Sequence, residues 1–504
     1  MKTTTPRAPS MLQALIPLLF LVTLLVLGII LFADDAVYGA SQIALLLASG
    51  VASLIGLRNG LGWEEIEEAL VRGVSVSVGA ILILLAVGAL IGSWLLSGTV
   101  PTLIVYGMKL LHPSYFYPAA CLICAVTSLA IGSSWTTAGT VGVALVGIAQ
   151  GMDLSLPLAA GAVVSGAYFG DKLSPLSDTT ILSPAVAGAE LFSHIRNLMW
   201  TTGPSMVIAL VMFTVAGLLD HGTGGDTASA GTLSAVLEAQ FNPAWYLLLP
   251  MALVFWLAFK RFPAYPTILI GALVGLLFAI VFQPDNVVAL AGNEALSRPM
   301  ALLAGAWTAL FNGYQAGTGN AVADELLSGG GMSNMLNTVW LVICAMCFGA
   351  VMERTGLLTR LVRGVLALAT SARSLIVSTL LTAFGTNVLT ADQYMSLVLP
   401  GKLYQSEYAR RRLSPLNLSR ALEDGGTITS PLIPWNTCAA FMATTLGVST
   451  LDYLPFAFFN LVNFGLAFIA AWVGFRILPL EAGARADAGV TPPGPDRDAG
   501  LAGG

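Results

Sequence analysis

The stretch SGAYFGDKLSPLSDTT (165–180) decides the fold, because it puts three ionisable side chains and a Ser-Pro between long apolar runs. Asp171, Lys172 and Asp178 surround Pro175. A proline inside a helix removes an amide donor and clashes with the preceding turn, so we expect a helix to break between Asp171 and Asp178. An ionisable group at the bilayer centre costs roughly 2.5–3.5 kcal/mol on insertion scales and is by default functional. The stretch therefore predicts an ion or proton site within a broken membrane helix.

The composition of the chain is that of a membrane protein. Hydrophobic residues make up 56% of the 504 residues and charged residues only 10%, too few to cover a soluble protein of this length. The run 11–33 is too long for a signal peptide and has no small-residue cleavage site, so we expect a retained helix. No nucleotide-binding loop, nucleophile elbow or metal spacing with histidine is present. The sequence therefore indicates neither an ATP-driven pump, nor an enzyme, nor a nucleic-acid-binding protein.

Apolar runs of spanning length predict an all-α, polytopic fold of about ten spans and two re-entrant hairpins. Two segments, 114–150 and 374–400, have polar middles, GSSWTT (132–137) and GTNVLTADQ (385–393), which suits re-entrant hairpins whose tips are buried in protein. Two more are interrupted by polar residues, at 157–190 and 424–447. The continuous runs lie at 11–33, 37–57, 76–97, 200–219, 243–260, 264–283, 333–352 and 452–476. The acidic segment Trp63–Arg72 should be a separate interfacial helix.

Landmarks recur along the chain at a nearly constant offset and in the same order, which indicates two homologous halves. Gly107 has a counterpart in Gly364, the tip at Gly132 has one at Gly385, and Ser174-Pro175-Leu176 recurs as Ser430-Pro431-Leu432. Basic residues are placed oppositely in the two halves: 97–114 holds one, and its counterpart 353–373 holds four. By the positive-inside rule, matching segments therefore face opposite sides, which predicts inverted repeats.

The same rule predicts the domain order and orientation. Lys2 and Arg7 place the N-terminus in the cytoplasm, and the C-terminus is expected there as well. The expected units are an N-terminal helix over 1–35, a first repeat over 36–220, an external loop and linking helix over 221–263, a second repeat over 264–477 and a disordered cytoplasmic tail over 478–504.

Oxygen-bearing side chains gather at the predicted breaks and tips. The first break offers Ser174, Ser177 and Thr179, with backbone groups freed by the interrupted helix, as hard ligands for a small cation. A carboxylate at such a site can hold a proton or a sodium ion but not both, which is the minimal machinery of antiport. Lys172 could pair with an aspartate and be displaced by the cation, or only snorkel to an interface.

The second half repeats this pattern in EDGGTITSPLIPWNT (423–437), another broken helix. Asp424 is taken as the counterpart of Asp171, and Asn436 and Thr437 stand roughly where Asp178 and Thr179 stand. The hydroxyls of the hairpin tips could be interhelical hydrogen-bonding groups, but as a converging set they favour a site. The predicted ion- or proton-binding residues are Asp171, Asp178, Asp424, Asp392, Ser174, Ser177, Thr179, Asn436, Thr437, Ser133, Ser134 and Asn387. The sodium ligands among them would be Asp171, Asp178 and Asp424, with Lys172 as their charge partner.

Four long motifs give the chain a family resemblance. It resembles the NhaC-type sodium/proton antiporter family, a branch of the ion-transporter superfamily, over residues 11–476. The resemblance implies an inner-membrane, often dimeric carrier with inverted repeats and two re-entrant hairpins. Relatives also exchange sodium and protons with malate and lactate, or carry amino acids. The motifs are GALIGSWLLSGTVPTLIVYG (88–107), SGAYFGDKLSPLSDTT (165–180), GTNVLTADQYMSLVLPGKLY (385–404) and EDGGTITSPLIPWNTCAAFM (423–442).

The expected function is exchange of cytoplasmic sodium for external protons across the cytoplasmic membrane by alternating access. The partners are then sodium ions, protons and the lipid bilayer, with a homodimer implied by the resemblance and no cofactor beyond the transported ions. The alternative is a sodium- or proton-coupled carrier of a small organic acid or amino acid, whose carboxylate would meet Lys172, the helix N-termini or Trp435. An ion channel is disfavoured because the polar residues cluster at breaks and do not form a continuous stripe.

Overall fold

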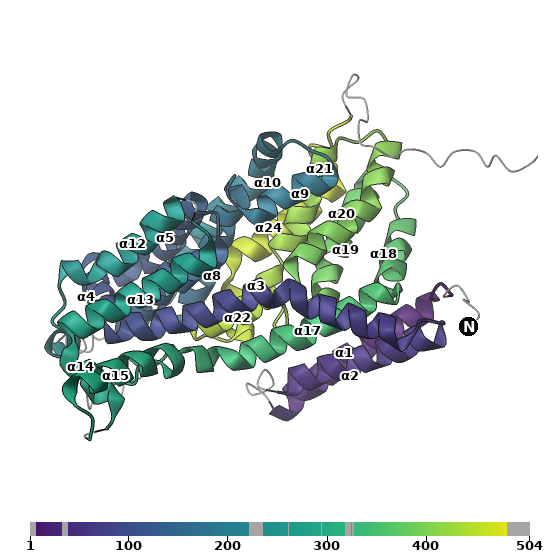
Figure 1. Ribbon diagram of the computed structural model, residues 1–504. Helices are drawn as coiled ribbons and strands as arrows, with labels where there is room; N and C mark the ends of the chain where they lie inside the picture. The colour runs from purple at the N-terminus through teal and green to yellow at the C-terminus, as the bar shows by residue number, and fades with distance from the viewer. Residues whose placement is uncertain are drawn as a thin grey trace, which may run out of the picture.

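The apolar runs of the sequence fold into α-helices, as the computed structural model of the chain shows (Figure 1). The structure describes residues 7–32, 39–220, 235–260, 262–293, 295–317, 324 and 327–480. Within these ranges the regular structure is helical, and extended backbone pairs only in two isolated bridges, at Tyr314–Gly329 and Leu413–Pro479. Lys2, the loop 221–234, Arg261 and the tail 481–504, which enter the orientation and domain predictions, lie outside the described residues.

The described chain contains eight helices that are long and apolar enough to cross a membrane, or ten if two bent pairs each count as one span. The bent pairs are Ala235–Phe241 with Trp245–Phe259, at 85°, and Thr450–Phe456 with Phe458–Val473, at 61°. The prediction of an all-α, polytopic fold is therefore confirmed, whereas the inversion of the halves and the domain boundaries stay predictions. The eight are α1 (Met11–Phe32), α2 (Ala40–Arg58), α3 (Trp63–Leu96), α5 with the turn before it (Pro113–Ile131), α10 (Leu191–Asp220), α13 (Ala264–Phe282), α17 with the turn before it (Met332–Arg354) and α19 (Ala372–Thr390).

Helix α3 is one unbroken helix of 34 residues, so the prediction of a separate interfacial helix over its first turns is wrong. Gly73 follows the acidic segment directly, but a single glycine costs a helix about 1 kcal/mol without ending it. That glycine packs against α17, where an added Cβ would lie 2.6 Å from Ala350 Cβ. The acidic end is tied to the same helix by the ion pair of Glu65 with Arg354, at 2.6 Å. Figure 1 shows α3 and α17 running side by side.

Both predicted hairpins consist of two helical arms that meet at a polar tip. The first tip is at Gly132, where φ is 77°, between α5 (Phe116–Ile131) and α6 (Ser134–Thr137). The second joins α19 to α20 (Gln393–Arg410) at Ala391, where φ is 55°. This turn lies within the predicted tip 385–393 but near its end, since α19 continues through Gly385 to Thr390. The first arm of each hairpin is long enough to span a membrane.

Both predicted broken helices are present. In the first half α8 (Leu156–Leu173) ends and α9 (Asp178–Ala187) begins after four non-helical residues that contain Pro175. In the second half the break is longer. Helix α21 (Pro415–Leu422) continues into the π-helical turn η7 (Glu423–Thr427), and the short turn η8 (Ser430–Leu432) precedes α22 (Thr437–Leu446).

The two halves repeat the same local devices in the same order, which supports the predicted duplication. A left-handed residue ends the first arm of each hairpin, and a side chain then caps the next helix. A second capping side chain starts the helix after each break, and a left-handed glycine ends it. The matched pairs are Gly132 and Ala391, Ser133 and Asp392, Ser177 and Asn436, and Gly188 and Gly447. Asn436 thus matches Ser177, one residue from the predicted pairing with Asp178.

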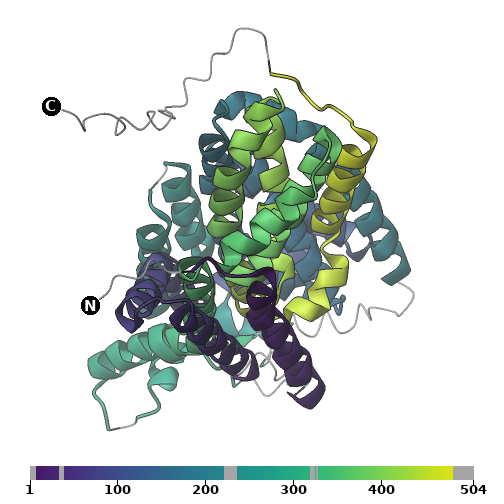
Figure 2. The same ribbon diagram turned by 90° about the vertical axis from the view of Figure 1, so that its right-hand side faces the viewer.

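Small residues allow the first hairpin to lie directly against the first broken helix. A Cβ on Gly166 would lie 2.1 Å from the Cys121 carbonyl oxygen, and one on Gly170 would lie 2.3 Å from the Ala125 carbonyl oxygen. Cys121 and Cys124 are buried in the same contact. Figure 2 shows the molecule turned by 90°, with the purple helices α1 and α2 in its lower half and the yellow helix α24 (Phe458–Val473) at the upper right.

Candidate functional site

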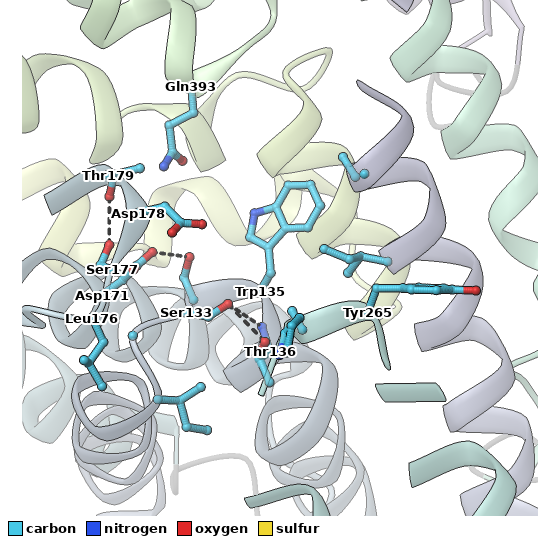
Figure 3. Close-up of a pocket in the computed structure, with 18 of the residues that line it drawn as sticks. Ser133, Trp135, Thr136, Asp171, Leu176, Ser177, Asp178, Thr179, Tyr265 and Gln393 are labelled. Carbon is cyan, nitrogen blue, oxygen red and sulfur yellow. Dashed lines mark hydrogen bonds between the residues drawn. The ribbon is translucent and has the colours of Figure 1, made fainter. Parts of the chain in front are cut away.

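Both hairpin tips and both breaks meet at one cavity of about 830 Å³. Each tip is joined to the break of its own half. Gly132 lies against Leu176, whose Cβ would be 2.6 Å from an added glycine Cβ. Thr437 donates its amide to the Ala391 carbonyl oxygen at 2.9 Å. Residues of α3 and of the segment 258–267 complete the wall. Figure 3 shows the cavity from within.

Asp171 lies in the last turn of α8 and directs its carboxylate toward the first hairpin tip (Figure 3). Its side chain is buried, and Oδ2 accepts a hydrogen bond of 2.7 Å from the Ser134 hydroxyl. The backbone of Asp171 is also held across the break, because the Thr180 hydroxyl donates a hydrogen bond to the Asp171 carbonyl oxygen at 3.0 Å. Asp171 is therefore a buried carboxylate that lines the cavity and has one oxygen bonded to a tip hydroxyl.

Asp178 lies on the other side of the break, in the first turn of α9, and is exposed. A negative charge at a helix N-terminus is favoured by the helix dipole, and Ser177 caps this helix by accepting the Thr180 amide at 3.4 Å. The Ser177 and Thr179 hydroxyls are 3.1 Å apart (Figure 3). Asp171 and Asp178 are near enough for their charges to interact. The first break thus offers one buried and one exposed carboxylate beside two buried hydroxyls.

Asp392 brings a third carboxylate to the cavity, from the second tip. It also has a structural role, since Oδ1 accepts the Met395 amide at 2.8 Å and so caps α20. The neighbouring Gln393, which was not among the predicted residues, lines the cavity too. Its Oε1 accepts hydrogen bonds from the Ser430 hydroxyl at 2.7 Å and the Cys438 thiol at 2.9 Å. The second tip therefore contributes a capping carboxylate and a fixed amide.

Asp424 does not line the cavity, although it was predicted to match Asp171. It forms a buried ion pair with Lys172. Asn463 joins the pair by donating to Asp424 at 2.8 Å and accepting from Lys172 at 3.2 Å. Thr201 Oγ1 lies 3.3 Å from Asp424 Oδ2. Lys172 is thus the charge partner of Asp424 and not of Asp171, and the three predicted sodium ligands do not form one cluster.

The remaining predicted residues divide between the cavity wall and the supporting structure. Ser133, Ser134, Ser177, Thr179 and Thr437 line the cavity. Three others bond to neighbouring backbone or side chains outside the lining, as interhelical hydrogen-bonding groups do. These are Ser174, which donates to the Leu129 carbonyl oxygen at 2.9 Å, Asn387, which donates to Thr429 at 3.0 Å, and Asn436, which donates to Asn387 at 3.2 Å.

The described lining of the cavity is acidic and contains no lysine, arginine or histidine. Tyr394 interacts electrostatically with all three carboxylates, which places them around one region. Trp135, stacked on Phe441 with ring centroids 4.3 Å apart, supplies an aromatic wall. In the described part of the chain no three His, Cys, Asp or Glu side chains converge as a preformed metal centre. Carboxylate and hydroxyl oxygens can hold a hard cation, and each carboxylate can exchange that cation for a proton.

Sequence reasoning missed Gln393, Tyr394 and Trp135 because none of them carries a charge. Each lies within two residues of a predicted residue at a hairpin tip, and this proximity in the sequence was the available signal. It also missed Glu423, which is fully buried beside Asp424 and accepts a hydrogen bond of 2.8 Å from Ser183.

Comparison with known proteins shows the family to which the chain belongs. The Na(+)/H(+) antiporter NhaC of Alkalihalophilus pseudofirmus is 38% identical over 460 residues, which cover 90% of this chain and 96% of that relative. The malate-2H(+)/Na(+)-lactate antiporter of Bacillus subtilis is also 38% identical, covering 93% of this chain and 96% of the relative. The arginine/ornithine antiporter ArcD of Halobacterium salinarum is 36% identical, covering 94% and 93%. The Na+/H+ antiporter family matches residues 4–189 and 166–475. The chain is therefore a multi-pass membrane transporter that belongs to the Na+/H+ antiporter family.

Proposed function

We propose that this chain exchanges sodium ions for protons across the cytoplasmic membrane, and that the exchange takes place at the cavity between the tips and the breaks. The observation that carries the proposal is Asp171, a buried carboxylate that lines this cavity and is bonded to Ser134 of the opposing tip. Broken helices around a shared cavity are typical of secondary transporters that alternate between two openings.

In this proposal Asp171 is the group at which sodium and proton compete. The Ser134 hydroxyl holds one oxygen of its carboxylate, and the Ser177 hydroxyl and the exposed Asp178 are the nearby groups that could complete a shell of oxygens. A proton on Asp171 removes the charge that attracts the cation, so that one ion leaves as the other binds. The cytoplasmic membrane, cytoplasmic termini and a homodimer belong to the proposal as expectations from charge distribution and family.

A carrier of an organic solute is the second candidate, and the size of the cavity favours it. About 830 Å³ is within the range of small-molecule pockets and far exceeds what one sodium ion needs. The charge of the lining argues against an organic anion, because the described lining is acidic and Lys172 is already paired with Asp424. A solute that carries a positive charge would suit the carboxylates and Trp135 better than malate or lactate.

The test uses the purified protein in liposomes that contain a pH-sensitive dye. An external sodium pulse should make the interior more alkaline as protons leave, and the Asp171→Asn variant should give no response. Asp452→Asn, the same chemical change at an exposed position, should respond like the wild type. Uptake of labelled malate, lactate, arginine and ornithine in the same vesicles tests the second candidate. A wild type that moves one of these solutes without any sodium-driven proton flux would overturn the proposal.

A further inference from the structure

Glu423 is a buried carboxylate outside the cavity with an unusual hydrogen-bonding state. Its side chain is 0% exposed. Oε1 accepts the Ser183 hydroxyl at 2.8 Å, but Oε2 is buried and has no hydrogen-bond partner among the residues that the structure describes. The Thr427 hydroxyl is close enough to interact with Glu423, but the two groups do not reach the distance and angle of an ordinary hydrogen bond. A buried polar atom without a partner costs stability, so an orphaned carboxylate oxygen in a π-helical turn indicates a function.

The surroundings of Glu423 are charged, but none of the residues that the structure describes forms an ion pair with it. Lys172 and Asp171 face it from α8, and Lys172 already pairs with Asp424, the next residue in the chain. Two more ionisable groups lie on the elements around it. These are Arg420, one turn earlier on α21 and facing Asp424, and His194 on α10, facing Lys172. The cation nearest to Glu423 is therefore neutralised by its neighbour, and Glu423 is suited to carry a proton.

A single side chain connects Glu423 to the cavity. The Ser183 hydroxyl that donates to Glu423 also lies 3.1 Å from the Thr179 carbonyl oxygen, and Thr179 lines the cavity. Ser183 is buried in α9, one turn after Thr179. Glu423 is thus one side chain behind the wall that contains Asp171 and Thr179.

On its other side, Glu423 adjoins a column of buried polar groups along α21 and α10. The His194 ring Nδ1 and the Ser419 hydroxyl are 2.8 Å apart, and the Asn197 amide donates to the Leu416 carbonyl oxygen at 3.1 Å. The column extends to the first turn of α21, where Ser414 and Pro415 are only half-buried. Buried polar atoms without a protein partner are commonly held by internal water, so this column can relay protons. Such atoms here are Glu423 Oε2, Thr427 Oγ1, Arg420 Nη1, His194 Nε2, Asn197 Oδ1 and Thr202 Oγ1.

We propose that Glu423 is a second proton-binding group of the exchanger, distinct from the cavity carboxylates, and that it passes protons between the cavity and the end of the molecule at which α21 begins. A proton released at the cavity forms an O–H bond at Glu423 and leaves it for the polar column, with no change in oxidation state. Chains of Asp, Glu and His carry protons in this way inside membranes. The inference rests on the proposed sodium/proton exchange.

The test separates proton movement from sodium movement in the same liposomes. Sodium/proton exchange is followed by the internal dye, and sodium/sodium exchange is followed by ²²Na+ counterflow, which needs no net proton transfer. In Glu423→Gln we expect sodium/proton exchange to fall by at least roughly a hundredfold, the lower end of the range for loss of a proton-transfer group, while counterflow stays near the wild-type rate. Glu407→Gln, the same change at a residue paired with Arg410 at the surface end of α20, should leave both rates near the wild type.

Either of two results would overturn the inference: Glu423→Gln slows both modes equally, or it slows neither. Ser183→Ala provides a second variant in case Glu423→Gln does not fold, because it removes only the hydroxyl that joins Glu423 to the cavity wall. It should shift the pH dependence of sodium/proton exchange and leave counterflow unchanged, and an unshifted pH profile would count against the route. A wild type without any sodium-driven proton flux would instead overturn the proposed function itself.

Discussion

Asp171 and Lys172 are neighbours in the sequence but bind on different sides of α8. The Asp171 carboxylate accepts a hydrogen bond from Ser134 at the cavity, whereas the Lys172 ammonium pairs with the buried Asp424 of the second half. Adjacent side chains on a helix point about 100° apart, which allows one turn to serve both partners. The first broken helix thus places a carboxylate in the cavity and a cation against the second broken helix.

Loss of one member of the Lys172–Asp424 pair should destabilise the protein more than loss of both. Lys172→Met leaves Asp424 charged and buried without its counter-ion, which typically costs about 3–5 kcal/mol. The double variant Lys172→Met/Asp424→Asn removes both charges, so thermal unfolding in detergent should occur at a higher temperature than in the single variant. A double variant that unfolds at the same temperature as Lys172→Met would show that the ion pair is not the cause.

The exposed and the buried carboxylate of the first break should differ in how much sodium/proton exchange depends on their charge. Asp178 is exposed at the start of α9, so the loss of its charge should weaken sodium binding by about 1 kcal/mol, or roughly fivefold. Asp178→Asn should therefore raise the KM for sodium by that factor and retain exchange, unlike Asp171→Asn. The measurement is the sodium dependence of the proton flux. Complete loss of exchange in Asp178→Asn would instead make Asp178 an essential ion-binding group.

A methyl group at the α5–α8 contact should destabilise the protein. Gly166→Ala would place a Cβ 2.1 Å from the Cys121 carbonyl oxygen, so the two helices would have to separate. Overpacking of this kind typically costs about 1–3 kcal/mol, measurable as a lower temperature of thermal unfolding. Gly203→Ala on α10 is the matched control, because no atom lies within 4 Å of the added Cβ. Equal unfolding temperatures for the two variants would contradict the close packing.

The end of α20 should contribute a pH-dependent stabilisation. Hydrogen bonds from Arg410 and Arg411 lower the pKa of Glu407 to about 2. Because this folded-state pKa is below the ordinary value, the stabilisation is present above about pH 4.5 and is lost as the pH falls toward 2. Wild type should unfold at a higher temperature than Glu407→Gln at pH 6, with a smaller difference at pH 3. A difference that does not change with pH would exclude this ion pair as its source.

The sequence predicted the breaks and the first tip because their determinants are local. Pro175 ends a helix wherever it stands in such a run, and Gly132 adopts a left-handed backbone at little cost. The helical class also followed from apolar runs alone. Within the predicted second tip, 385–393, the turn itself could not be located, because Gly385 is a helix interior residue here and the turn lies at Ala391, a residue type that gives no turn signal.

The role of Asp424 could not be predicted, because it depends on which face of a helix meets which neighbour. Asp171 stands three residues before Ser174, whereas Asp424 stands six residues before the matching Ser430. That difference, together with the π-helical turn η7, places Asp424 beside Lys172 and Asn463 and away from the cavity. Residue type made the two aspartates look equivalent, and only the packing of the halves distinguishes them.

Helix α3 runs without interruption from its exposed acidic end to the cavity. Its first turn is tied to α17 by Glu65 and Arg354, and Val76–Ile83, farther along the same helix, lie in the cavity wall. Because an α-helix rises 1.5 Å per residue, the two regions are roughly 20 Å apart along the same continuous helix. A tilt of the acidic end would therefore also displace the part of α3 that forms the cavity wall.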